Sequence, residues 1–264
     1  MKPVLLGLAL FGLIGLSLQR ADETILADAE RSFSEGVKVR NDAETARKHF
    51  SRAAQDYDEL WQNGHRNPAL ARNRARAHRL AGNLPAAIAA LHEGLAVARY
   101  DRALQVELED ARAALSYPHD DLAEQCRPRP IGGIGTRMSA LEAYLAAGGL
   151  WLLACLGAAR FAMTRAPAWL FASGIALLAL ATLGGFWWHD HDRQSEANAR
   201  PLLIVKDDSA LKLGNGESWP DRVKWKLPRG VEVRELARRG GWIQVELASG
   251  TVGWLPETNL IPVS

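Results

Sequence analysis

This chain has few cysteines and almost no net charge. Its 264 residues include two cysteines, and 32 basic side chains nearly balance 30 acidic ones, which leaves a formal net charge of +2. Cys155 lies within an apolar run and Cys126 lies ahead of a Pro-rich segment. We therefore expect no disulfide between them, and the soluble parts must fold by core packing alone. The charge balance argues against a nucleic-acid partner, which favours a concentrated basic face.

Motifs that carry catalysis are also missing. The sequence holds no P-loop, no zinc-spaced set of cysteines and histidines, no GxSxG and no HExxH. The run His189–Asp192 offers imidazoles and carboxylates to a divalent metal, but its spacing sends the imidazoles to different faces of a helix end, so a polar cap is the alternative. Glu142, near the start of the first apolar run, either lines an ion path or simply extends its carboxylate to water at the membrane surface. We expect no catalytic residue, cofactor or metal, and neither an enzyme nor a channel subunit.

Long apolar runs, by contrast, are present. Ala143–Ala159 and Ala166–Trp188 are separated by a short loop that contains Arg160 and Arg165. About 20 apolar residues cross the ~30 Å hydrocarbon layer as a helix. A helix on the surface of a soluble domain has a polar stripe that faces water, and neither run has one. A pair of buried core helices is the alternative interpretation. The runs predict a membrane hairpin, with transmembrane helices over 140–160 and 166–188 and both flanking segments on one side.

Two further features of these runs suit lipid. Small residues allow close helix contact where hydrophobicity cannot drive association, and tryptophans near run ends fit the interfacial aromatic belt. The glycines are Gly148, Gly149, Gly157, Gly174 and Gly184, and the tryptophans are Trp151, Trp169, Trp187 and Trp188.

The first segment, 1–20, predicts export. One lysine precedes an uninterrupted apolar run whose length fits a secretory signal. A small-residue cleavage site is missing, so the segment is either a signal peptide or a signal anchor. Residues from Asp22 onward are then outside the cytoplasm, and the Arg160/Arg165 loop is cytoplasmic, as the positive-inside tendency asks. Three arginines before the first crossing disagree with that tendency: Arg127, Arg129 and Arg137.

Residues 22–117 predict helices throughout, because alanine, arginine, leucine and glutamate dominate. Within them, Asn67–Tyr100 reads as two short helices joined near Gly82. This segment resembles a tetratricopeptide repeat, a helix–turn–helix unit of about 34 residues that must stack on neighbours. The residues that occupy the packing and turn positions of the repeat are Ala75, Gly82, Ala87 and Leu91.

Parts of this helical region depart from the repeat. Arg74 replaces an apolar residue and Arg99 replaces the closing proline, and a plain helical bundle without a ligand groove is the alternative. The arginines of Arg72–Arg79 predict either a solvated face or a groove for acidic peptides. Tyr100–Leu115 is expected to be a final, solvating helix. An earlier, degenerate copy of the repeat is suggested by Phe33, Val37, Ala46, Phe50 and Ala53.

After a predicted linker over 118–138 and the hairpin, residues 200–264 form a separate module. Short β-prone runs alternate with turn residues, which predicts a small antiparallel barrel. The expected strands are Leu202–Val205, Ala210–Leu213, Val223–Leu227, Val231–Ala237, Trp242–Leu247 and Thr251–Leu255.

This module resembles a bacterial SH3-like domain. The turn residues Leu227 and Gly230, the pair Gly241-Trp242, the hairpin glycine Gly250 and the run Gly253-Trp254-Leu255 carry the resemblance. Trp242 and Trp254 belong either to the core or to the edge of a ligand groove, where exposed tryptophans stack on proline-rich peptides or sugar rings.

Together these parts give a fold class of α-helical tetratricopeptide-like hairpins, a two-helix transmembrane hairpin and a small all-β SH3-like barrel. This order resembles BatE-type proteins, named from the Bacteroides aerotolerance operon. The matching residues of the repeat region are Gly64, Pro68-Ala69-Leu70, Asn73, Ala75, Gly82, Ala87-Ile88 and Leu95.

The resemblance implies an envelope scaffold in an aerotolerance or stress complex. Its partners would be proteins with von Willebrand factor A domains and a MoxR-type ATPase. The chain is then a multi-pass protein of the bacterial inner membrane, in contact with membrane lipid and with both soluble modules in the periplasm. A cell-wall receptor is the alternative, whose SH3-like domain binds peptidoglycan peptides or glycans.

Overall fold

The computed structural model describes residues 22–128, 140–198 and 200–263. The predicted signal segment 1–20 and most of the approach to the first apolar run lie outside these ranges. The chain divides into two compact units. One joins Met1–Arg127 to Leu202–Ser264, and the other is Pro128–Pro201. The C-terminal module is therefore not separate from the helical region, because the two build one unit.

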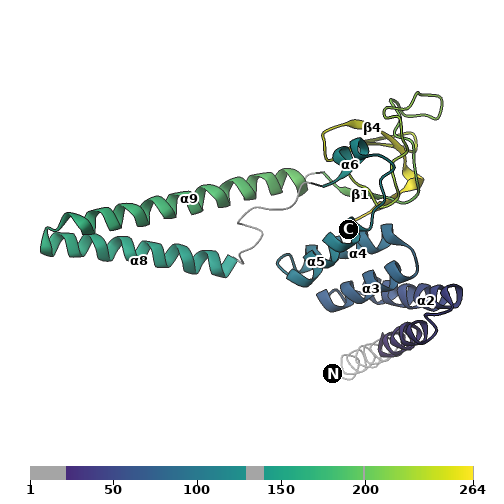
Figure 1. Ribbon diagram of the computed structural model, residues 1–264, viewed down its shortest axis with the longest axis horizontal. Helices are drawn as coiled ribbons and strands as arrows, with labels where there is room; N and C mark the ends of the chain where they lie inside the picture. Colours follow the sequence, from purple (N-terminus) through teal and green to yellow (C-terminus); the bar gives the residue numbers. More distant parts are fainter. Residues whose placement is uncertain (1–21, 129–139, 199, 264) are drawn as a thin grey trace, which may run out of the picture. The chain divides into compact units, whose positions relative to one another are not determined.

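Helices form the first half of the joined unit (Figure 1). A helix over residues 22–38 precedes α2, and each later helix packs on the one before it. The bounds are Ala43–Gln62 for α2, Pro68–Leu80 for α3, Leu84–Val97 for α4 and Arg102–Ala113 for α5.

Side-chain caps explain where these helices begin. The carboxylate of Asp42 accepts from the backbone of Glu44 and Thr45 at the start of α2, and Asn67, Asn83 and Asp101 cap α3, α4 and α5 in the same way. Each cap satisfies a backbone donor that the helix leaves free. The residues at the helix starts therefore determine locally where each helix begins.

Alanines dominate the contacts between these helices. Ala53, Ala71, Ala77 and Ala90 are completely buried or nearly so, and Gly94 stands where an added Cβ would lie 2.6 Å from the Cβ of Ala71. Small side chains let the helix axes approach closely, so a narrow core is filled to the usual interior density.

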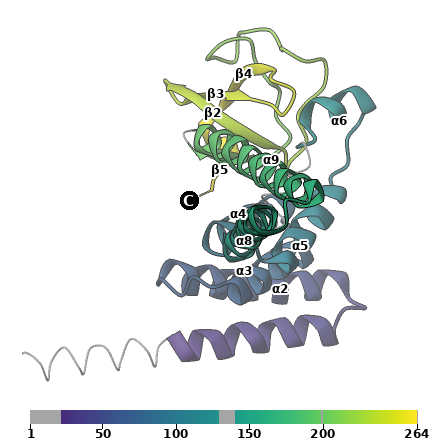
Figure 2. The same cartoon turned by 90° about the vertical axis from the view of Figure 1, so that its left-hand side faces the viewer.

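The second half of the joined unit is a small antiparallel sheet (Figure 2). Its strand order is β4-β3-β2-β1-β5 among the described residues. The strands are β1 Leu202–Val205, β2 Glu232–Arg239, β3 Trp242–Glu246, β4 Val252–Pro256 and β5 Leu260–Pro262, with a short 3-10 helix, Glu257–Asn259, before the last.

The expectation of a closed barrel is wrong. β4 and β5 stay at opposite edges of the sheet, and the expected strands Ala210–Leu213 and Val223–Leu227 form only isolated bridges. Pro220 and Pro228 lack a backbone donor, and the loop glycines favour turns, so this stretch does not sustain a ladder. The β-prone composition of this module agrees with the sheet, but the loop over 206–231 interrupts it.

The expected linker over 118–138 also contains structure. Residues Asp120–Cys126 form α6, whose Leu122 and Cys126 join the buried core of the sheet. These two side chains are four residues apart and so lie on one helix face. The backbone N–H of Ser249 donates to the carbonyl of Gln125 at 3.0 Å. The chain after the helical array is therefore fastened to the sheet before it reaches the apolar hairpin.

A continuous apolar core joins the helical array to the sheet. Ile204 of β1 is fully buried in the helical core, and Leu202, Ile261 and Val263 pack against it. The final helix α5 is not merely solvating, because Leu104, Leu108 and Ala111 are buried in the same core.

Gly230 lies where the sheet contacts the helical array. Its φ is +94°, and an added Cβ would lie 2.6 Å from Cδ2 of Leu115 and 3.3 Å from Cδ1 of Ile88. Both the backbone conformation and the space therefore require glycine at this turn.

Replacement of Gly230 by alanine tests this packing. Gly250→Ala is the matched control, because Gly250 also has positive φ (+89°) but its nearest atom, Oε1 of Glu246, is 3.9 Å away. The backbone strain is common to both, so we expect Gly230→Ala to lower the free energy of unfolding by about 1–3 kcal/mol more than the control. Denaturant unfolding of the full chain in detergent measures the difference. Equal losses of stability in the two variants would mean that Leu115 and Ile88 can move aside without cost.

The second unit contains two long apolar helices, α8 (Ala140–Thr164) and α9 (Pro167–Asn198), which lie side by side (Figure 1). They are connected at Arg165, which has a φ of 54°. Each is long and apolar enough to cross a membrane, over Leu141–Thr164 and Pro167–Trp188. The predicted bounds, 140–160 and 166–188, stop short of the helix ends.

Candidate functional site

The repeat residues named from the sequence lie at the contact of α3 and α4. Ala75, Ala87 and Leu91 are buried, with 3%, 1% and 2% of their surface exposed. Gly82 lies in the turn with a φ of +83° and has no atom near its Cβ position. These residues are placed where a helix–turn–helix unit needs small side chains and a left-handed turn.

Two arginines of α3, Arg74 and Arg76, form ion pairs with neighbouring helices, whereas Arg79 is exposed as a solvated face requires. The guanidinium of Arg74, 12% exposed, bridges the carboxylates of Asp58 on α2 and Glu93 on α4. Nε of Arg76 donates to Glu107 of α5 at 2.9 Å. These side chains tie neighbouring helices together, so they are not free to receive an acidic peptide.

His78 completes the buried network around Asp58. Its Nε2 lies 3.0 Å from Oδ2 of Asp58. Burial by itself raises the pKa of the Asp58 carboxyl, but the contacts with His78 and Arg74 outweigh it, and the net pKa is lowered. The carboxylate therefore stays ionised between the guanidinium of Arg74 and the imidazole of His78, and a buried charge requires such partners.

A second charged cluster crosses from the helical array to the sheet. The guanidinium of Arg112 on α5 donates to both carboxylate oxygens of Glu232 on β2, at 2.6 and 2.7 Å. Nε2 of His92 on α4 lies 3.0 Å from Oε2 of Glu232, in an orientation unsuited to a hydrogen bond. Burial pushes the pKa of Glu232 up, but Arg112 and His92 outweigh it and hold that pKa at about 2.

The sequence alone does not predict this cluster. Arg112 and Glu232 are 120 positions apart, and no local pattern links an arginine in a helix to a glutamate that opens a strand. The cluster joins the segments before and after the apolar hairpin, together with the core around Ile204.

Trp242 and Trp254 lie on the outer face of the sheet rather than in its core. Burial alternates along β3 and β4, so that Ile243 and Leu255 point inward. Trp242 pairs with Pro256, and Gln244 pairs with Trp254. Both tryptophans are half-buried.

Side chains two residues apart on paired strands share a face. We call Trp242, Gln244, Trp254 and Pro256 the outer aromatic face. The two tryptophans are diagonal neighbours, and each is partly open to solvent.

The apolar hairpin exposes its large side chains instead of burying them. Trp151, Leu153, Leu156, Phe171 and Ile175 are between 56% and 73% exposed. A soluble protein rarely exposes an apolar surface as large as one that covers two such helices. The part of the chain that the structure describes therefore contains a surface suited to lipid.

Aromatic side chains lie toward both ends of the hairpin. Near its open end, the rings of Tyr144 and Trp187 are 5.4 Å apart. Near its turn, Cζ of Arg160 lies 5.8 Å from the ring centroid of Trp169. Trp169 and Trp187 are 18 residues apart on α9, or about 27 Å along a helix. That separation is close to the ~30 Å thickness of the hydrocarbon layer.

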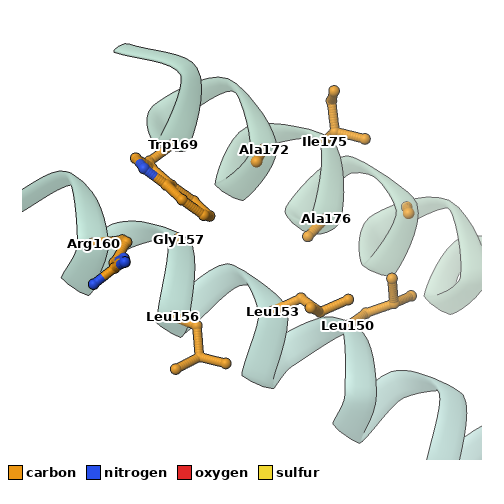
Figure 3. A pocket seen from close by; sticks show the side chains of 10 residues that line it. Leu150, Leu153, Leu156, Gly157, Arg160, Trp169, Ala172, Ile175 and Ala176 are labelled. Atoms are coloured by element: carbon orange, nitrogen blue, oxygen red, sulfur yellow. The ribbon is translucent and has the colours of Figure 1, made fainter. Parts of the chain in front are cut away.

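The two helices touch through small side chains near the turn. The hydroxyl of Ser173 donates to the carbonyl of Ala154 at 2.8 Å, and an added Cβ at Gly157 would lie 3.2 Å from the carbonyl oxygen of Trp169. Beside this contact runs an open groove of about 620 Å³ (Figure 3). The close contact that was expected of the glycines occurs at Gly157, while Gly148 and Gly174 meet no other side chain.

Within the described residues there is no cluster of histidine, cysteine or acidic side chains that could hold a metal ion. The side chains of His189–Asp192 are outside what the structure describes. Comparison with protein-family models, curated proteins and solved structures finds no match for this chain. The description of the molecule therefore rests on its own structure, a joined helix-and-sheet unit whose chain is interrupted by an apolar hairpin.

Proposed function

We propose that this protein is a non-enzymatic envelope scaffold, anchored by a two-helix membrane hairpin and carrying one joined unit for protein–protein contacts. The observation that carries the proposal is the exposed apolar surface of α8 and α9. Burial of apolar surface in lipid stabilises by roughly 25 cal/mol per Å² removed from water. Only 11% and 6% of the apolar stretches of the two helices are buried.

The joined unit supports a hairpin rather than a single crossing. Met1–Arg127 and Leu202–Ser264 share one core, and a chain that leaves that core and returns to it must cross the bilayer an even number of times. Two helices that could span the membrane lie between these segments. The same arithmetic supports one compartment for the helical array and the sheet, and with the predicted export segment we infer that this compartment is the periplasm.

The interaction role rests on a tetratricopeptide-like array and an SH3-like sheet. The buried Ala75, Ala87 and Leu91 with the turn at Gly82 support the first assignment. The strand order and the outward Trp254 support the second, although the sheet is open. The BatE-type resemblance extends the proposal to partners with von Willebrand factor A domains and a MoxR-type ATPase in an aerotolerance or stress complex.

The outer aromatic face favours a second candidate, a receptor for the cell wall. Partly exposed indoles on the outer face of a sheet can stack on sugar rings or on extended peptides. The receptor would use the same anchor and differ only in what the aromatic face binds.

Retention of the full chain in detergent separates the two functions. A scaffold retains a defined set of envelope proteins, identified by mass spectrometry after crosslinking, and does not sediment with purified sacculi. The double variant Trp242→Ala/Trp254→Ala should lose these proteins, whereas Trp219→Ala, which removes a more exposed indole (51%), should keep them. Sedimentation with sacculi that depends on Trp242 and Trp254 would replace the scaffold by the receptor. Loss of neither kind of binding in the double variant would overturn both uses of this face.

A further inference from the structure

The groove between α8 and α9 has a charged end and an aliphatic body. Ten residues line it, and Arg160 is the only charged one. Figure 3 shows Trp169 reaching from α9 toward Arg160 on α8, with Leu150 and Leu153 turned into the space between the helices. The groove therefore presents one cation near the hairpin turn and hydrocarbon along the rest of its length.

Its length matches one leaflet of a bilayer. Leu150 and Arg160 are ten residues apart on α8, which is about 15 Å along a helix. Half of the ~30 Å hydrocarbon layer is the depth that one acyl chain occupies. Arg160 lies about one turn before the end of α8, where a long cationic side chain reaches the interface.

The chemistry of the lining excludes water as a stable occupant. A buried water needs two to four polar partners, and Leu150, Leu153, Ala172 and Ala176 offer none. An unfilled space would forfeit the dispersion contacts of its walls. A hydrocarbon chain suits this apolar lining. The guanidinium of Arg160 adds an anion-binding group at the level of the lipid headgroups.

We propose that this groove binds a single anionic phospholipid, with one acyl chain along Leu150 and Leu153 and the phosphate paired with Arg160. The ring of Trp169 stacks beside the guanidinium and holds it toward the headgroup. This inference rests on the proposed membrane anchor, and it adds a specific lipid to the general one that surrounds the hairpin.

Native mass spectrometry of the full chain, released from phosphatidylcholine nanodiscs doped with phosphatidylglycerol, tests the proposal. We expect the wild type to retain one phosphatidylglycerol. Arg160→Gln should weaken retention about tenfold, the effect of one charge-assisted contact, and Arg160→Lys should keep the preference for the anionic lipid. Ala172→Leu should fill the groove and displace the lipid.

Matched variants remove charge and add volume elsewhere. Arg47→Gln lowers the net charge by one at an exposed position of α2, and Ala158→Leu adds the same volume on an exposed part of α8 outside the groove. Both should retain phosphatidylglycerol as the wild type does. Equal retention by all variants, or a lipid-free dimer of the wild type, would overturn the lipid site while leaving the anchor intact. A chain that leaves membranes on carbonate extraction would overturn the anchor and the lipid site together.

Discussion

Glu232→Gln is expected to lower the free energy of unfolding of the full chain by about 3–5 kcal/mol, because it leaves the buried guanidinium of Arg112 without its counter-charge. Arg112 and Glu232 are 15% and 7% exposed at their side chains, so water does not replace the lost carboxylate. The imidazole of His92, also 15% exposed, loses the same partner. Chemical denaturation in detergent, followed by far-ultraviolet circular dichroism, measures the loss.

The control for this substitution is an ion pair in water. Glu44 and Lys48 pair on α2 with side chains 80% and 74% exposed, and such pairs contribute little to stability. Glu44→Gln should therefore leave the unfolding midpoint nearly unchanged. If Glu232→Gln proved as mild as Glu44→Gln, the buried cluster would not hold the helical array to the sheet.

The same cluster gives the wild type an acid-dependent stability with a defined sign. The pKa of Glu232 is about 2 in the folded chain, against an ordinary value of 4.5, so the folded state favours the ionised carboxylate. Its contribution, of order 3 kcal/mol, is complete above pH 4.5 and disappears as the pH falls toward 2. The stability difference between wild type and Glu232→Gln should shrink over this interval.

Local features of the chain were predictable because short segments determine them. The limits of β1 follow from the run Leu202–Val205, and the apolar hairpin follows from composition over two stretches longer than 20 residues. The left-handed turn at Gly82 fits the break that the sequence shows between two helical runs. Each of these depends on neighbours within a few residues, which is the range over which periodicity and turn chemistry act.

Contacts between distant segments could not be predicted. The helix α6 is not predictable because seven residues between prolines have weak helix propensity. It is stabilised by contacts with the sheet, through the buried Leu122 and Cys126 and the hydrogen bond from Ser249 to Gln125. The ion pairs of Arg74 and Arg76 were not predicted, because their carboxylate partners are on other helices.

The closed barrel failed for a related reason. Alternating β-prone residues in Ala210–Leu213 and Val223–Leu227 predict strands, but pairing also needs a partner edge with free backbone groups. The bridge between Lys212 and Trp254 reaches β4 at one point only, and the intervening turns keep the rest of this loop away from the ladder. Composition indicates β structure, whereas closure depends on the path of the whole loop.

Thiol labelling of native membranes is expected to leave both cysteines unmodified, for different reasons. Cys126 is fully buried, and burial raises the pKa of its thiol to about 12 from 9, which lowers the reactive thiolate about a thousandfold at a given pH. Cys155 lies on α8 and is exposed on the protein surface, so only lipid can shield it from a charged, membrane-impermeant maleimide. Denaturation in urea and detergent should make both thiols reactive.

Two added cysteines extend this experiment to the topology of the chain. Ser51→Cys on α2 and Ser218→Cys in the sheet loop are both exposed sites, and each is placed in a Cys155→Ala background. Because the segments that carry them share one core, both should have the same accessibility. With the proposed periplasmic placement, both should label in spheroplasts and both should be protected in sealed inverted vesicles. Labelling of Cys155 in native membranes at the rate of Ser51→Cys would show that water, not lipid, surrounds the hairpin. Opposite accessibility of the two added cysteines would mean that the helical array and the sheet lie across the membrane from each other, which their common core forbids.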